Sequence, residues 1–481
     1  MTFSFFNNKS AINRKFIIGL LVITILSIAI LTVPDLLGLN LSLSLQLLSI
    51  VLVSVYVVLA FEMVHRMVIV LVGAMIAIII GITTDLFPAT DSFEFAVNSI
   101  DFNTIGLLLG MMIIVVILAE TGIFQYVGLK MFKISKGNMW KLLILMTVFT
   151  AVVSMFIDNV TTILLMLPVT FSIFRILNVS PIPFVLAQTL SSNVGGTATL
   201  IGDPPNIMIG SAANIDFNSF LIHLGPAIAV SFLVSLVMFR LFFRKELKVE
   251  PQNLKTLMTQ DERSLIKDRP LLKKSLFVLF SVIVLFVIHG SLHIEPSLIA
   301  LGGAGILFLI SKSKPEKIFH EVDWTTLVFF AGLFIIISVG EESGMIDLLA
   351  KTAINITGGD PWITFFLIIW LGAIASSFVD NIPFTATMIP LTAVLIQDGA
   401  IVAGFGELAI NPLWWAIALG VGLGGNGTLI GSSAGVIATG LSEKHGHIIT
   451  FNRFFKVGFP FMICTVAVGS IVLMIDTLLR L

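Results

Sequence analysis

The stretch Ser154-Met155-Phe156-Ile157-Asp158-Asn159 returns 222 residues later as Ser376-Ser377-Phe378-Val379-Asp380-Asn381. Each copy places an Asp-Asn pair inside a long apolar stretch. An ionised Asp at the centre of a membrane span costs about 2.5 to 3.5 kcal/mol, so a chain that carries two of them at matching places is expected to use them. The alternative is that both pairs only form structural turns, and we favour the functional interpretation.

Composition sets the class of protein. With 57% hydrophobic and 11% charged residues over 481 positions, the chain is too apolar for a water-soluble core. We therefore predict an all-α polytopic membrane protein. The net charge of -1 argues against a nucleic-acid partner. The single cysteine, Cys464, excludes an intramolecular disulfide framework and most thiolate metal sites, and we interpret the seven histidines as interfacial.

Lysine and arginine are distributed unevenly between the predicted spans, and they mark the cytoplasmic side. Lys9, Arg14 and Lys15 precede the first apolar run, which lacks a cleavage site and is kept as a span. They predict a cytoplasmic N-terminus. The acidic segment 85–101 has no Lys or Arg and is expected outside, whereas 240–274 is rich in both and is expected inside.

The two Asp-Asn segments are predicted to be re-entrant hairpins. The first lies between Lys141 and Arg175, which are both expected inside, and the second lies between Asp360 and Asp398, which are both expected outside. The count is then about 11 transmembrane helices plus two hairpins in two inverted repeats. The predicted parts are a leading span (1–40), a first repeat (41–243) with hairpin 139–175, a cytoplasmic linker (244–274), and a second repeat (275–481) with hairpin 361–397.

Further identities support the duplication. At the same offset of 222 the chain repeats Asp101/Asp323, Thr104/Thr326, Gly110/Gly332, Glu120/Glu342, Gly122/Gly344, Pro168/Pro390 and Thr170/Thr392. After a loop of different length the offset becomes 229, which aligns Gly195-Gly196 with Gly424-Gly425 and 199–202 with 428–431. Inverted repeats with paired glycine-interrupted segments predict a midplane binding site in a secondary transporter.

The two glycine-rich stretches, 193–206 and 424–433, are poor continuous helix. Glycine lowers helix stability and Pro204-Pro205 removes two backbone donors, so we predict an unwound break in each stretch. Lipid cannot satisfy the freed backbone groups. Such backbone is therefore expected only where it lines a cavity or binds an ion.

A hairpin tip beside an unwound helix brings carboxylate, amide, hydroxyl and carbonyl oxygens together, which suits Na⁺, and the carboxylates can instead hold H⁺. Helix N-termini at the tips would favour an anionic solute. We expect a coupling ion, Na⁺ or H⁺, no other cofactor and no enzymatic reaction. Expected Na⁺ ligands are Asp158, Asn159, Gly195, Asp380, Asn381 and Gly425. The full expected solute- and ion-binding set adds Thr161, Thr162, Asn193, Gly196, Thr197, Thr199, Asp203, Asn206, Thr385, Thr387, Gly424, Asn426, Thr428, Ser432 and Ser433.

Four motifs carry a resemblance to a known family: 158–162 (DNVTT), 202–206 (GDPPN), 380–390 (DNIPFTATMIP) and 424–431 (GGNGTLIG). With them the chain resembles the ion transporter superfamily, in the branch of arsenite permeases, D-type Na⁺/H⁺ antiporters and the melanosomal P protein, which carries a citrate-transporter-like domain. The P protein group is the most similar. The resemblance implies a homodimer in which scaffold domains hold an elevator-type transport domain of hairpins and broken helices.

Related carboxylate carriers have Ser-Asn-Thr at their tips, where this chain has Asp158 and Asp380. Added negative charge opposes a dicarboxylate unless it is protonated or paired with a cation. Na⁺/H⁺ antiport, proton-coupled transport of arsenite or an anion, and a di- or tricarboxylate carrier therefore stay open. Two alternatives from other classes also stay open. One is an intramembrane aspartyl protease built on Asp158 and Asp203, although its Gly-x-Gly-Asp signature is missing. The other is a passive channel.

Overall fold

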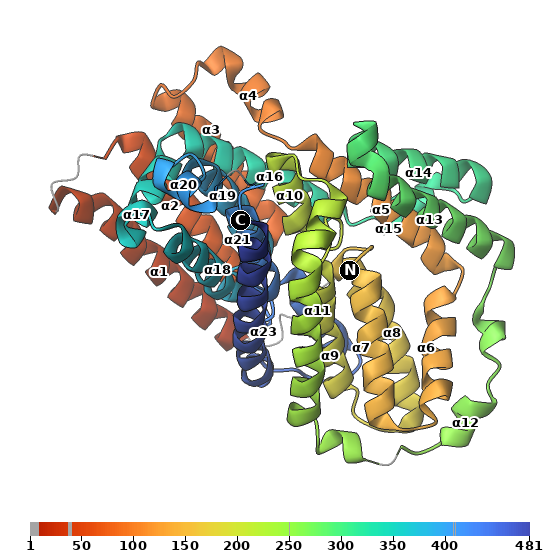
Figure 1. Ribbon diagram of the computed structural model, residues 1–481. Coiled ribbons are helices and arrows are strands. Elements are labelled where there is room, and N and C mark those ends of the chain that lie inside the picture. The colour runs from red at the N-terminus through yellow and green to blue at the C-terminus, as the bar shows by residue number, and fades with distance from the viewer. Residues whose placement is uncertain (1–8, 37–40, 250, 407, 409) are drawn as a thin grey trace. The chain divides into compact units, whose positions relative to one another are not determined.

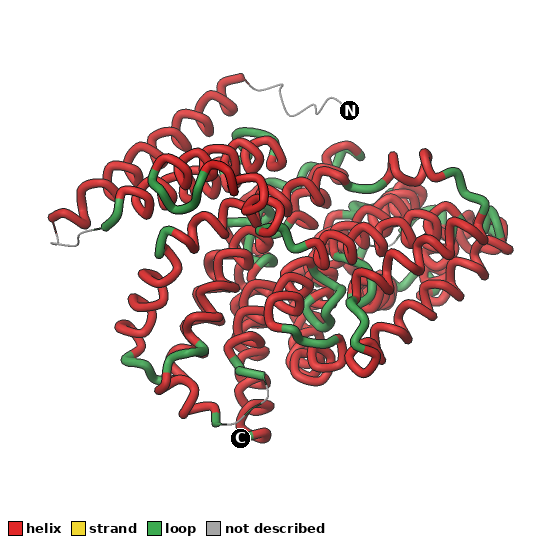
Figure 2. Tube along the Cα trace, turned by 90° about the horizontal axis from the view of Figure 1, so that it is seen from above, coloured by secondary structure: helices red, strands yellow, loops and turns green. Residues whose placement is uncertain are grey.

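The computed structural model describes residues 9–36, 41–249, 251–406, 408 and 410–481. Lys9, Arg14 and Lys15 have no described side chains. All regular structure in the described ranges is helical, as Figure 2 shows. Ten described helices are long and apolar enough to cross a membrane, or eleven if α19 (Asn381–Leu395) and α20 (Gly399–Phe405) form one broken span. The prediction of an all-α polytopic membrane protein is confirmed.

The chain divides into two compact units. Unit 1 consists of Met1–Asp101, Trp324–Gly359 and Ala386–Asp398, and unit 2 of Phe102–Asp323, Asp360–Thr385 and Gly399–Leu481. Each unit takes segments from both predicted repeats. Helix α19 is divided between the units after Thr385.

Unit 1 is built around the packing of α3 on α16. Its elements are α1 (Lys9–Leu36), α2 (Leu43–Ala60), α3 (Arg66–Thr83), the 3₁₀ turn η2 (Ala89–Asp91), α4 (Ser92–Asn98), α16 (Trp324–Glu342), α17 (Met345–Thr357) and the later part of α19. Glycines allow the close approach of α3 and α16, since a Cβ at Gly73 would overlap Ile336 and one at Gly332 would overlap Val70.

Unit 2 contains both helix breaks and both tips. Its elements in Figure 1 are α5 (Phe102–Glu120), α6 (Ile123–Ser135), α7 (Met139–Ser154), α8 (Asn159–Leu177), α9 (Ile182–Gly196), α10 (Pro204–Ala213), α11 (Phe217–Phe242), η3 (Glu246–Lys248), α12 (Leu254–Thr259), η4 (Glu262–Leu265), α13 (Arg269–Leu292), α14 (Pro296–Ser311), α15 (Pro315–Glu321), α18 (Pro361–Phe378), the start of α19, α20, α21 (Leu413–Gly424), α22 (Ser433–Lys444) and α23 (Phe451–Arg480). Helix α7 packs on α9, α18 packs on α21, and α11 lies along α23 (Figure 1).

Both Asp-Asn pairs lie where one helix ends and the next begins. Helix α7 ends at Ser154 and α8 begins at Asn159, while α18 ends at Phe378 and α19 begins at Asn381. The predicted interruptions of the glycine-rich stretches are present too. Residues 197–203 separate α9 from α10, and 425–432 separate α21 from α22. These two segments are called break 1 and break 2 below, and the two Asp-Asn pairs tip 1 and tip 2.

Side-chain contacts within each half follow the two sequence offsets. Ser154 Oγ donates to the Ser192 carbonyl at 2.7 Å, and Ser376 Oγ donates to the Val421 carbonyl at 2.9 Å. The donors are 222 residues apart and the acceptors 229. The sequence duplication is therefore a duplication of tertiary contacts between a tip helix and a broken helix.

The same offsets relate the close backbone contacts. A Cβ at Gly195 would overlap the backbone of Ala151, and a Cβ at Gly424 would overlap that of Ala373. These glycines allow the broken helix to touch the helix that leads to the tip. A larger residue at either position would separate them.

The linker between the repeats binds the end of α8. The Gln252 N–H donates to the Leu177 carbonyl at 3.0 Å, and Asn253 Nδ2 donates to the Ile176 carbonyl at 3.2 Å. The last carbonyls of a helix have no partner within the helix. The linker therefore completes the hydrogen bonding of the α8 C-terminus.

Further along, the linker binds α6 and the end of α5. Lys133 Nζ donates to Glu262 Oε2 at 2.5 Å, and the Lys267 N–H donates to the Thr121 carbonyl at 2.9 Å. The hydrogen bond from Lys133 lowers the pKa of the Glu262 carboxyl below its ordinary value. Residues 252–267 thus form a strap across the ends of α8, α6 and α5.

The first prediction concerns this strap. Because the folded-state pKa of Glu262 is lowered, its stabilising contact is fully present above the ordinary glutamate pKa of about 4.3 and is lost as the pH falls through the lowered value. Glu262→Gln should raise amide hydrogen exchange across 260–266 at neutral pH, and the difference from wild type should vanish in acid. Glu246→Gln, an exposed substitution earlier in the linker, is the control. Unchanged exchange at neutral pH would show that the ion pair does not hold the strap.

The second prediction concerns the close helix contact. Gly195→Ala forces a Cβ into the Ala151 backbone and should cost about 1–3 kcal/mol of stability through overpacking. Gly302→Ala in α14 meets no atom within 4 Å, and should be neutral or stabilising by up to about 1 kcal/mol. Thermal unfolding in detergent measures both. Equal melting temperatures for the two variants would contradict the proposed close approach.

Candidate functional site

The two tips and the two breaks all belong to unit 2, and the polar contacts described below join them to one another. Asp158, Asn159, Asp203, Asn381 and Ser432 are buried. Each tip is held by its own break, since the Thr199 hydroxyl donates to a carbonyl of the first tip turn and the Thr428 hydroxyl donates to one of the second. The polar side chains then connect the two halves.

Tip 2 binds break 1 through a carboxylate. Asn381 Nδ2 lies 3.3 and 3.2 Å from the two carboxylate oxygens of Asp203 and donates to them. The Asn381 N–H donates to the Gly431 carbonyl of its own half at 3.2 Å. Asn381 is therefore fixed between the two breaks.

Tip 1 binds break 2 through Asn193, a residue near the end of α9. Asn159 Nδ2 donates to Asn193 Oδ1 at 3.0 Å. Asn193 Nδ2 in turn donates to Asn426 Oδ1 and Ser432 Oγ, both at 2.9 Å. A continuous set of amides and a hydroxyl thus joins the halves on this side.

The two tip carboxylates also cap helices. Asp158 Oδ1 accepts the Thr161 N–H at 2.9 Å, and Asp380 Oδ1 accepts the Ile382 N–H at 3.2 Å. Asp380 Oδ2 accepts the Ser433 hydroxyl at 2.6 Å. The interpretation as structural turns thus has a real basis, because an Asp at an N-cap satisfies an otherwise free backbone donor. It does not require a carboxylate, since Asn caps equally well.

Asn206 supplies hydrogen-bond donors to the carbonyls of break 1. Break 1 is not helical, so these carbonyls have no helical N–H partner, and Pro204 and Pro205 bring no N–H of their own. Asn206 Nδ2 donates to the Thr197 and Thr199 carbonyls at 3.0 and 2.8 Å. Break 1 is therefore tied to α10 by one side chain.

Several buried polar atoms around the tips have no protein partner among the described residues. They are Asn159 Oδ1, Asn206 Oδ1, Asn426 Nδ2 and Ser191 Oγ. Leaving a buried polar group unpaired costs about 1–3 kcal/mol, so such atoms are expected to bind water, an ion or a solute. The free oxygens suit a cation, and the free amide N–H group suits an oxygen of a solute.

The charges of this cluster are not balanced by basic side chains. Among the described residues, neither Asp158 nor Asp203 forms an ion pair with Lys or Arg. Asp203 is also close enough to Asp380 and Asp158 to be repelled by their charges. A buried carboxylate in this setting needs a cation or a proton.

The other residues of the expected site have local roles. The Thr162 hydroxyl donates to the Ile157 carbonyl just before α8, and the Thr385 hydroxyl donates to the Asn381 carbonyl of its own helix. Gly196 lies against the Gly202 carbonyl, and Gly425 against that of Gly431. Thr387 is different because it belongs to unit 1, where its hydroxyl bonds to Tyr56.

The sequence analysis missed Gln188 and Ser192 of α9. Gln188 Oε1 accepts the Thr170 hydroxyl at 2.7 Å and its Nε2 donates to Thr150 Oγ1 at 3.2 Å, while Ser192 Oγ donates to the Asn159 carbonyl at 3.0 Å. Both side chains are fully buried. The available signal was the run of polar residues 188–193 within an apolar helix.

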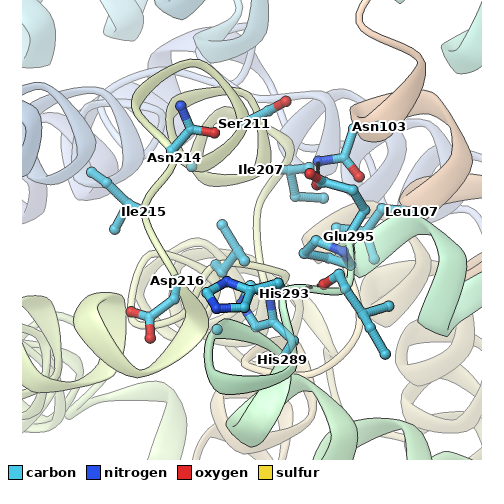
Figure 3. Close-up of a pocket in the computed structure, with 15 residues that line it drawn as sticks. Asn103, Leu107, Ile207, Ser211, Asn214, Ile215, Asp216, His289, His293 and Glu295 are labelled. Atoms are coloured by element: carbon cyan, nitrogen blue, oxygen red, sulfur yellow. Dashed lines mark hydrogen bonds between the residues drawn. The ribbon is translucent and has the colours of Figure 1, made fainter.

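A separate cavity of about 480 Å³ lies at the ends of α10 and α13 and the beginning of α11 (Figure 3). Ile207 and Gly210 of α10 form part of its wall. The same helix carries Asp203 at its N-cap and Asn206 in its first turn. One short helix therefore borders both the polar cluster and the cavity.

Comparison with known proteins shows the family of the chain. The citrate transporter family model matches residues 56–420. An uncharacterized transporter of Mycobacterium tuberculosis is 39% identical over 424 residues, which cover 88% of this chain and 96% of the relative. The P protein of Mus musculus is 33% identical over 502 residues, which cover 88% of this chain and 59% of the P protein.

A solved structure shares the fold. The crystal structure of the Alcanivorax borkumensis YdaH transporter, reported to have an unusual topology, superposes with a TM-score of 0.54 at 14% identity. The match covers 85% of this chain and 98% of that one. The helices, the repeated tips and these similarities define an integral membrane transporter. The chain belongs to the citrate transporter family, and its resemblance to the P protein group is confirmed.

The third prediction concerns the bridge between the halves. Asn193→Ala removes the donor to Asn426 and Ser432 and the acceptor for Asn159, and should cost about 1–2 kcal/mol, the range measured for hydrogen bonds between membrane helices. Thermal unfolding in detergent measures the loss. Asn218→Ala, which removes one hydrogen bond at a less buried position, is the matched control and should cost less. A larger loss in the control would contradict the structural role of Asn193.

Proposed function

We propose that this protein is a cation-coupled secondary transporter in which Asp158 and Asp380 bind the coupling ion, Na⁺ or H⁺. The observation that supports this most directly is the pair of buried carboxylates Asp158 at tip 1 and Asp203 at break 1, neither of which has a basic partner among the described residues. The half-buried Asp380 at tip 2 adds a third carboxylate. Binding and release of a cation would change the charge of the cluster. That change gives the protein a means of coupling ion movement to a conformational change.

For Na⁺, we propose two half-sites related by the repeat. The first takes Asp158, Asn159 and the Gly195 carbonyl, and the second takes Asp380, Asn381 and the Gly425 carbonyl. Carboxylate, amide and carbonyl oxygens are the ligands that hard cations prefer. The unpaired Asn159 Oδ1 supports the first half-site.

The negative charge of the three carboxylates limits which solutes we propose. Na⁺/H⁺ antiport needs no other solute, and proton-coupled movement of arsenite or an anion uses the same carboxylates. A di- or tricarboxylate is a weaker candidate, because three nearby carboxylates repel it unless cations or protons neutralise them. An aspartyl protease is weaker still, since the relatives are transporters.

The remaining proposals concern assembly and orientation. We propose a homodimer with a cytoplasmic N-terminus in a bacterial plasma membrane, in which hairpins and broken helices move as an elevator-type transport domain relative to a scaffold. The uneven distribution of lysine and arginine supports the orientation. The duplicated tip and break contacts support a transport domain made of both halves.

The fourth prediction separates charge from capping. Asp158→Asn keeps an N-cap for α8 but removes the carboxylate, whereas Asp158→Ala removes both and should also cost about 0.5–2 kcal/mol of stability. In proteoliposomes, Asp158→Asn should abolish proton flux driven by a Na⁺ gradient and radioactive Na⁺ uptake driven by a pH gradient, with little loss of thermal stability. Asp380→Asn should behave in the same way.

Asp261→Asn, which changes an exposed carboxylate of the linker, is the matched control and should keep wild-type flux. Arsenite and citrate uptake are measured in the same vesicles, with the Na⁺ and pH gradients varied separately. If Asp158→Asn retains both wild-type flux and wild-type pH dependence, the tip carboxylates only form turns and the proposed mechanism is wrong.

A further inference from the structure

The cavity beside α10 has the dimensions of a ligand site. Its volume of about 480 Å³ lies within the usual range of about 300–1,000 Å³ for small-molecule pockets. It is formed by the ends of α10 and α13 and the beginnings of α5, α11 and α14 (Figure 3). None of the residues proposed above to bind the coupling ion lines it.

The lining of the cavity includes two carboxylates and two histidines. Asp216, His289, His293 and Glu295 surround it in Figure 3, together with amide and hydroxyl groups. None of its 15 lining residues is Lys or Arg. A concave wall with carboxylates and no basic side chain concentrates positive ions and repels anions.

Backbone hydrogen bonds hold His289 in the wall of the cavity. Its Nε2 accepts the Phe217 N–H at 3.2 Å, and its Nδ1 lies 3.3 Å from the Ile294 carbonyl oxygen. The ring is therefore fixed in the same wall as Asp216 and Glu295.

Both carboxylates are held in place before any ligand arrives. Asp216 Oδ1 accepts the Ser219 N–H at 2.9 Å at the start of α11, and Glu295 Oε2 accepts a hydrogen bond from Asn103 Nδ2 at 2.9 Å. Fixed orientation means that binding a cation needs little rearrangement. The site is thus preorganised for a positive ligand.

The position of the cavity links it to the polar cluster. Ile207, Gly210 and Ser211 face it from α10, and Leu200 of break 1 completes that wall. Asp203 and Asn206, at the beginning of the same helix, belong to the cluster. We infer that this cavity is a cation-binding vestibule, which takes a small monovalent cation next to the site that uses it and excludes carboxylate anions.

Its role as an entrance rests on the cation coupling proposed above, whereas its charge selectivity does not. The test therefore measures selectivity without transport. Ser211→Cys in a Cys464→Ala background places one thiol in the wall, since Cys464 is the single cysteine of the chain. Purified protein in nanodiscs, with both faces open, is labelled with a trimethylammonium or a sulfonate methanethiosulfonate of similar size.

The cationic reagent should react about tenfold faster than the anionic one, after correction for their rates with a free thiol. Glu295→Gln should lower that ratio roughly threefold, and the ratio should also fall as salt is added. Glu316→Gln, an exposed glutamate in α15 outside the cavity, is the matched control and should leave the ratio unchanged.

Each contrary outcome overturns the inference. Equal rates, a faster anionic reagent, or an equal fall in the ratio for both glutamine variants would show that the cavity carries no cation selectivity. A thiol that reacts with neither reagent would show that the cavity is closed to solutes. Loss of cation coupling in the flux assays with the labelling ratio intact would instead reject the proposed function and leave the selectivity of the cavity standing.

Discussion

The organisation of unit 2 depends on how it holds carboxylates away from water without basic partners. Asp158 and Asp203 are buried, and no Lys or Arg among the described residues pairs with either. A membrane interior offers no compensating solvent, so the protein supplies partial charges instead. Asp158 receives a backbone N–H at the start of α8, and Asp203 receives the amide of Asn381. Both are neutral donors, so the negative charge itself is not balanced by a basic side chain among the described residues.

The backbone repeats in both halves, but the polar residues do not. The offset of 229 places Ser432 at the position of Asp203 and Gly422 at the position of Asn193. Tip 2 therefore meets a carboxylate across the repeat, whereas tip 1 meets amides and a hydroxyl. The duplicated backbone places the tips and breaks at equivalent positions in the two halves. The substitutions at Asp203/Ser432 and Asn193/Gly422 give the two halves different charge. A transporter that handles an ion and a second species benefits from such a difference.

The sequence predicted the features that depend on residues close together in the chain, namely the spans and the helix breaks. Apolar length predicted the spans, and Gly195-Gly196 with Pro204-Pro205 predicted the end of α9 and the start of α10. Contacts across the repeat, such as Asn381 with Asp203, could not be read from spacing, because a repeat relates equivalent positions and leaves open which different positions touch. Thr387 shows the limit most clearly. It is two residues after Thr385 in the same helix, yet it bonds to Tyr56 in unit 1.

The cavity was beyond prediction for a related reason, since its wall comes from five helices in three separate parts of the chain. Its link to the cluster runs through α10. Asn206 Nδ2 binds the Thr197 and Thr199 carbonyls, and this ties break 1 to α10. A movement of α10 that reshapes the cavity wall would therefore strain the hydrogen bonds that hold break 1 in place. The cavity wall and the carboxylate of Asp203 thus depend on the same short helix.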